Sequence, residues 1–127
     1  MNLDQLYLFK SRKITESLSL LANVSSINIV VVDSLDEFEV DRCDGLVILT
    51  EGLDTDKHDQ ELLNIFESKR IPNRKVDLNG TLQVGLSSIE LWADSNKCKS
   101  IAISGGDEIL ANEKFIPFLE RLSQRIN

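Results

Sequence analysis

The sequence predicts an α/β fold, a three-layer sandwich in which helices cover both faces of a five-stranded, mainly parallel sheet. Two observations indicate it. Apolar segments of strand length alternate along the chain with segments whose apolar residues recur at helical spacing. The clearest strand candidates are also almost continuously apolar, which is typical of strands covered on both faces. We therefore expect a single α/β domain spanning residues 1–127.

Five segments are predicted to be strands. The two clearest are 27–32, a β-branched run that ends at Asp33, and 45–50, an apolar run that ends at Thr50. The other three, 6–9, 74–78 and 100–104, are shorter or more polar. We expect the following strand residues to be buried: Ile29, Val31, Leu46, Ile48, Ile101 and Ile103.

Four helices are predicted from apolar residues that recur every three or four positions. The first is expected over 12–24 and the second over 60–69. The third begins near Leu82, after the Asn79-Gly80 turn signal, and the last begins near Asn112.

The expected strand order is 2-1-3-4-5, as in flavodoxin-like folds. This order places the first strand beside the third, where the direction of the connections reverses. The loops that follow these two strands then face each other across a crevice, which is the usual ligand site of an open α/β sheet. We therefore expect functional side chains in the loops after residues 9 and 50.

Composition excludes several classes of protein. The chain carries 21 Asp+Glu against 14 Lys+Arg, and this net charge of -7 argues against a general binder of nucleic acid or of anionic membranes. No apolar run approaches the roughly 20 residues that span a bilayer, and the N-terminus lacks a basic signal segment. The two cysteines are far apart, and no Cys/His cluster has metal-ligand spacing. We expect a cytoplasmic protein with free thiols and no metal.

The loop after the first strand carries three cations and a hydroxyl, namely Lys10, Ser11, Arg12 and Lys13. These residues precede a predicted helix, whose N-terminal N–H groups and dipole favour anions. They are candidates for a phosphate or carboxylate clamp. The alternative is that they are solvated charges beside a helix that Ser11 caps.

The loop after the third strand is rich in acidic residues. Crowded carboxylates raise one another's pKa, which suits acid/base or oxocarbenium chemistry, and they also suit a divalent cation. The alternative is a solvated loop in which Asp56 or Asp59 caps the next helix. The titratable residues concerned are Glu51, Asp54, Asp56, His58, Asp59 and Glu61.

Two further features follow later in the chain. Gly105 and Gly106 follow the last predicted strand, where they allow the backbone to approach a ligand closely or form an ordinary loop. Leu91 and Trp92 are adjacent in a predicted helix. Both cannot face the core of an amphipathic helix, so one of them is expected in a contact surface, with a protein partner or a second copy.

The order of these features resembles Toll/interleukin-receptor domains and the related nucleoside 2-deoxyribosyltransferases. The similar segments are the polar loop at 10–13, the strand at 27–33, the apolar segment 44–49, the segment 60–63 and the dipeptide Ile71-Pro72. In catalytic members a glutamate at the position of Glu61 supports cleavage of an N-glycosidic bond to a ribose. The resemblance implies that role for Glu61 and nucleotide contacts for Ser11 and Arg12.

Two functions therefore remain open. The first is a non-catalytic interaction or regulatory module, favoured because the family's tryptophan before the glutamate and its glycine-rich loop are absent here. The alternative is a protein that binds a nucleotide or nucleoside phosphate and cleaves or transfers an N-glycosidic bond with Glu61. In the second case the expected ligand contacts are Lys10, Ser11, Arg12, Lys13, Glu51, Asp54, Gly105 and Gly106. The sequence identifies no cofactor.

Overall fold

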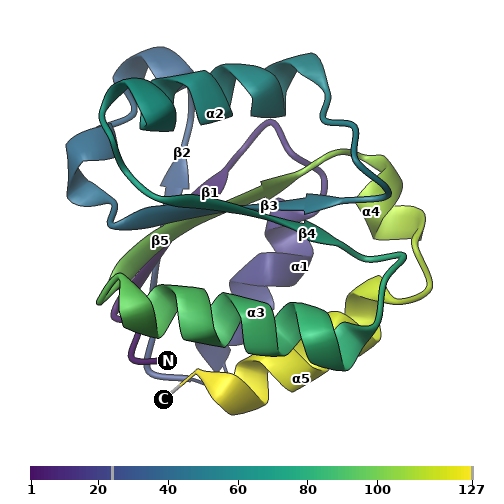
Figure 1. Ribbon diagram of the computed structural model, residues 1–127. Coiled ribbons are helices and arrows are strands. Elements are labelled where there is room, and N and C mark those ends of the chain that lie inside the picture. Colours follow the sequence, from purple (N-terminus) through teal and green to yellow (C-terminus); the bar gives the residue numbers. More distant parts are fainter. Residues whose placement is uncertain (24, 127) are drawn as a thin grey trace.

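The computed structural model describes residues 1–23 and 25–126. Its centre is an all-parallel five-stranded sheet in the order β2-β1-β5-β3-β4, with helices on both faces (Figure 1), so the predicted α/β fold class is confirmed. The strands are β1 (Gln5–Phe9), β2 (Asn28–Val32), β3 (Gly45–Thr50), β4 (Asn73–Asp77) and β5 (Ser100–Gly105).

The strand order differs from the expected 2-1-3-4-5, because β5 lies between β1 and β3. In the register, Ile101 pairs with Leu6 on one side and with Gly45 on the other. The apolar β5 is thereby buried, while β4, which carries the exposed Arg74 and Lys75, takes an edge. Charged side chains suit an edge strand and protect it from unwanted pairing, which explains why β4 is not internal.

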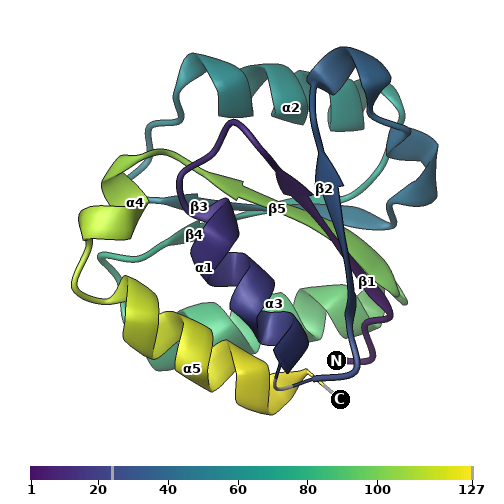
Figure 2. The ribbon, with the colours of Figure 1, turned by 180° about the vertical axis from the view of Figure 1, so that it is seen from behind.

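Three helices cover one face of the sheet (Figures 1 and 2). They are α1 (Thr15–Ser19), which continues as the 3-10 segment η1 (Leu20–Asn23), α3 (Leu82–Ser95) and α5 (Phe115–Arg125). The other face is covered by α2 (Lys57–Ser68) and by two 3-10 turns, η2 (Leu35–Glu37) and η3 (Val40–Arg42). The connections that lead along the sheet toward β4 cross it on the α2 face, and those that lead toward β2 cross it on the opposite face. This division is expected when all the crossover connections have the same handedness.

A separate apolar core lies on each face of the sheet. Phe115 and Phe118 of α5 belong to the core beneath α1, α3 and α5, and Phe9 and Phe66 belong to the core beneath α2. These large buried side chains fix each helical layer against the strands. Among the described helices, none is long and apolar enough to cross a membrane.

Helix boundaries differ from the expected ones at three places. The first helix begins at Thr15 rather than Arg12, and its expected end at Val24 lies outside the described residues. The second begins three residues early, at Lys57, because the Asp56 carboxylate caps it by accepting from the Asp59 N–H at 3.0 Å. The last expected helix is preceded by a separate short helix, α4 (Glu108–Ala111).

The burial of the strands follows the prediction except in β2. Leu46, Ile48, Ile101 and Ile103 are buried, as expected. Ile29 is only half-buried and Val31 is 47% exposed, so the prediction for Val31 is wrong. The cause is that β2 is an edge strand and the neighbouring α1 has only five residues, too few to cover it.

Candidate functional site

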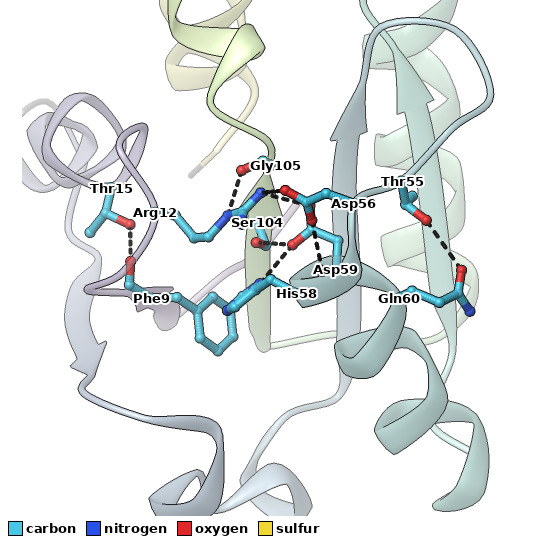
Figure 3. A network of polar contacts seen from close by, with 10 residues as sticks. All are labelled: Phe9, Arg12, Thr15, Thr55, Asp56, His58, Asp59, Gln60, Ser104 and Gly105. Atoms are coloured by element: carbon cyan, nitrogen blue, oxygen red, sulfur yellow. Dashed lines mark hydrogen bonds and ion pairs between the residues drawn. The ribbon is translucent and has the colours of Figure 1, made fainter.

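The side chain of Arg12 crosses the crevice at the carboxyl ends of the central strands. Its Nε donates to the Gly105 carbonyl at 2.8 Å, and its Nη2 donates to Asp56 Oδ2 at 2.6 Å (Figure 3). The same Nη2 lies 3.4 Å from Asp59 Oδ2. Arg12 therefore joins the loop after β1 to the end of β5 and to the first turn of α2. With its side chain only 8% exposed, it fills the space in which a ligand was expected.

Asp59 is the buried centre of this network, with a side chain only 2% exposed. Besides Arg12, its carboxylate accepts a hydrogen bond from Ser104 Oγ at 2.6 Å, and His58 Nδ1 lies 2.9 Å from Asp59 Oδ1 (Figure 3). A buried carboxylate is tolerated when it is paired and hydrogen-bonded, and these partners meet that need.

Asp56 carries the second negative charge against Arg12. Its partial burial favours the neutral acid, but the hydrogen bonds from Arg12 and from the Asp59 N–H outweigh that effect. Together they hold the pKa of the Asp56 carboxyl below its ordinary value. The pair is therefore ionised at neutral pH, and the guanidinium charge is neutralised within the protein.

The Ser104, Asp59 and His58 side chains do not form a nucleophilic triad. In a triad the imidazole lies between the serine and the carboxylate and takes the serine proton. Here the carboxylate of Asp59 lies between the other two, and Ser104 Oγ donates to it directly. Ser104 is completely buried, so it cannot reach a substrate. The His58 ring packs edge-on against Phe9, with centroids 5.7 Å apart.

Glu61 lies on the exposed side of α2 and does not join Arg12. It follows Asp59 by two residues, which places the two side chains about 200° apart around the helix axis. Because Asp59 points into the crevice, Glu61 points away from it. The catalytic role implied for Glu61 requires the opposite orientation, so this part of the expected site is not assembled.

The other residues of the expected anion clamp also point outward. Lys10, Ser11 and Lys13 are exposed, and the Nζ atoms of the two lysines lie 3.8 Å from Asp33 and 3.9 Å from Asp107. The Arg12 N–H donates to the Phe9 carbonyl at 2.9 Å, and this tight turn directs Arg12 inward while its neighbours face solvent.

The remaining expected contacts are dispersed. Glu51 accepts from Asn112 Nδ2 at 2.6 Å beside an open hollow of about 320 Å³, whereas Asp54 is exposed in its loop. Gly105 serves packing, because a Cβ there would lie 3.0 Å from Ile14 Cδ1 and 3.1 Å from the Leu49 carbonyl oxygen. Gly106 is buried next to it.

In residues 1–23 and 25–126, no cluster of three or more His, Cys, Asp or Glu could hold a metal ion.

A larger surface feature lies along α3, beside the edge strand β4. We call it the α3–β4 groove, an open hollow of about 630 Å³. Of the Leu91/Trp92 pair, Leu91 is 68% exposed and Trp92 is half-buried; that one of them belongs to a contact surface stays a prediction. Sequence reasoning missed the contribution of β4. The groove is lined by Arg74, Gln83, Val84, Ser87, Ser88, Leu91, Trp92, Ser95 and Asn96.

Comparisons with known proteins bear on the fold. No family model and no curated protein matches the chain. Among solved structures, one from Syntrophus aciditrophicus, named "putative molybdenum carrier protein", is similar with a TM-score of 0.68 and 11% sequence identity. The match covers 97% of this chain and 94% of that one. The two proteins therefore share a fold, and at this identity the likeness extends no further.

Proposed function

We propose that this chain is a non-catalytic interaction or regulatory module. The observation that carries the proposal is that Arg12 occupies the central crevice and is bound there by the Gly105 carbonyl and by the carboxylates of Asp56 and Asp59. In this reading the crevice residues hold the fold together, and the contact surface lies elsewhere.

An anionic ligand would compete poorly for Arg12. To bind a phosphate, the guanidinium would have to leave two carboxylates, one of them buried. An unpaired buried carboxylate costs several kcal/mol, and a phosphate contact would first have to offset that cost. The outward direction of Glu61 removes the proposed support for glycosidic chemistry as well. The neighbour named as a molybdenum carrier shares only 11% of its sequence, so its cargo is not transferred to this chain.

The α3–β4 groove is the best candidate for the contact surface. Val84 and Leu91 are 66% and 68% exposed and lie seven residues apart, two turns along one side of α3. Exposed apolar side chains gathered beside a groove are typical of protein interaction sites. Trp92 adds an aromatic ring to the same groove, and tryptophan is enriched among residues that dominate binding energy.

The test has two arms. In the first, the chain is titrated with NAD, a deoxynucleoside 5′-phosphate and molybdate in a calorimeter, and we expect no saturable heat from any of them. In the second, a photo-crosslinking amino acid replaces Leu91 or, as control, the 88%-exposed Leu53 in cells that express the protein. We expect a discrete protein adduct from position 91 alone. Saturable ligand binding that is lost in Arg12→Met would overturn the proposal, as would equal crosslinking from the two positions.

A further inference from the structure

We propose that the α3–β4 groove binds an acidic amphipathic helix of a partner protein. This inference rests on the proposed function and adds the chemical class of the partner. Three properties of the groove carry it: the spacing of its apolar side chains, the charge of its wall, and the way in which Trp92 is held.

The apolar side chains of the groove have the spacing of a helix-packing site. α3 has 14 residues, a length of about 21 Å at 1.5 Å per residue. Val84 and Leu91 stand one heptad apart on it, and the small side chains of Ser87 and Ser88 lie between them. Small residues between large ones let a second helix approach and insert its own apolar side chains, at positions i, i+3 or i+4, and i+7.

The charge of the groove selects an acidic partner. Arg74 is the one charged residue that lines it, and its guanidinium donates to Ser88 Oγ. Within the part of the chain that the structure describes, no carboxylate pairs with Arg74. A guanidinium without a carboxylate partner in the wall of the groove favours a partner that brings a carboxylate to it.

The same charges disfavour a second copy of this chain as the occupant. If two α3 helices packed antiparallel with Val84 of one against Leu91 of the other, the two-fold axis would pass beside Ser87 and Ser88. Because Arg74 is bonded to Ser88, the axis would bring the two Arg74 guanidinium groups together.

Trp92 is positioned to act as the anchor of the interface. One edge of its indole packs against Gly45 of β3, where a Cβ would lie only 2.6 Å from Trp92 Cη2. The rest of the half-buried ring lines the groove. A rigid aromatic ring loses little conformational freedom on binding. Since it is the only tryptophan in the chain, its fluorescence also reports occupation of the groove directly.

The experiment uses the full chain and two synthetic helical peptides without tryptophan. Both carry Leu at i, i+3 and i+7, with Glu and Ala at the other positions of one and Lys and Ala in the other. We expect a saturable change in Trp92 emission with the Glu peptide and at least tenfold weaker binding of the Lys peptide. Leu91→Glu should abolish the response, and Arg74→Glu should reverse the preference. Leu53→Glu, an equally charged change at an exposed site, should leave it unchanged.

Each contrary result overturns the inference. No saturable response to the Glu peptide, or equal affinity for the two peptides, would exclude an acidic helix as the partner. A dimer detected by sedimentation velocity and lost in Leu91→Glu would assign the groove to a second copy instead. In all three cases crosslinking from position 91 would still support an interaction module. Loss of that crosslink would remove the proposed function itself.

Discussion

The indole of Trp92 lies directly against the backbone of Gly45, the first residue of β3. A Cβ at Gly45 would be 2.6 Å from Trp92 Cη2, 3.0 Å from its Cζ2 and 3.2 Å from Cys98 Sγ. Gly45 is therefore the point where the sheet makes room for a ring that also lines the α3–β4 groove. The contact joins the core of the protein to its candidate interaction surface.

Gly45→Ala is expected to displace Trp92. The new methyl group overlaps ring carbons rather than a flexible chain end, and overpacking of this kind costs about 1–3 kcal/mol. The midpoint of urea unfolding should fall and the native Trp92 emission maximum should shift. Gly80→Ala is the matched control, because a Cβ there meets only the Asp77 carbonyl oxygen at 3.4 Å. Equal effects of the two substitutions would contradict the role of the Gly45 contact.

Arg12→Met is expected to lower the free energy of unfolding by about 3 kcal/mol, because it leaves the buried Asp59 carboxylate without its cation. Urea denaturation measures the change. Lys13→Met, at an exposed neighbour, should alter stability by less than about 0.5 kcal/mol. Adding Asp59→Asn to Arg12→Met should restore part of the loss, since no unpaired charge then remains. A double variant as unstable as the sum of the single variants would argue against a coupled pair.

The fold class could be predicted from the sequence because strand and helix periods are local signals. β3 was predicted with its observed bounds, 45–50. Strand adjacency is not local: it depends on which face each connection crosses. The polar composition of β4, with Arg74 and Lys75, was nevertheless a usable signal that this strand lies at an edge.

The position of Arg12 could be predicted from the sequence, but the partners of its side chain could not. Arg12 does lie at the crevice, yet whether its guanidinium meets a ligand or the protein depends on the Phe9–Arg12 turn, which no sequence pattern revealed. Which of the two carboxylates, Asp59 or Glu61, faces the crevice depends on where the helix begins. With Asp56 taken as the N-cap, Asp59 is the third helical residue and faces the sheet, whereas Glu61 faces solvent. Because the helix was expected to begin at residue 60, the inward position of Asp59 could not be predicted.

Both thiols are expected to be unreactive in the folded protein. Burial, and to a smaller degree the charge of Asp44, raises the pKa of Cys43 to about 12 and that of Cys98 to about 11. At pH 8 neither forms appreciable thiolate, which is the species that attacks disulfide reagents. Ellman's reagent should therefore react slowly with the native chain and label two thiols quickly in urea. Fast labelling of either cysteine under native conditions would contradict this.

The ion pair between Arg12 and Asp56 is expected to make stability depend on pH in the acid range. Because the folded-state pKa of Asp56 is lowered, the unfolded chain binds more protons. The stabilisation is therefore fully present above the unfolded value of about 3.9 and is lost as the pH falls through the lower, folded value. Asp56→Asn removes the charge but keeps a good N-cap. Urea denaturation at pH 7, 5, 4 and 3 measures the effect. At pH 7 the wild type should have a higher free energy of unfolding than this variant, and the gap between the two should narrow only below about pH 4. A gap that stayed constant down to pH 3 would mean that the Asp56 charge contributes nothing through Arg12.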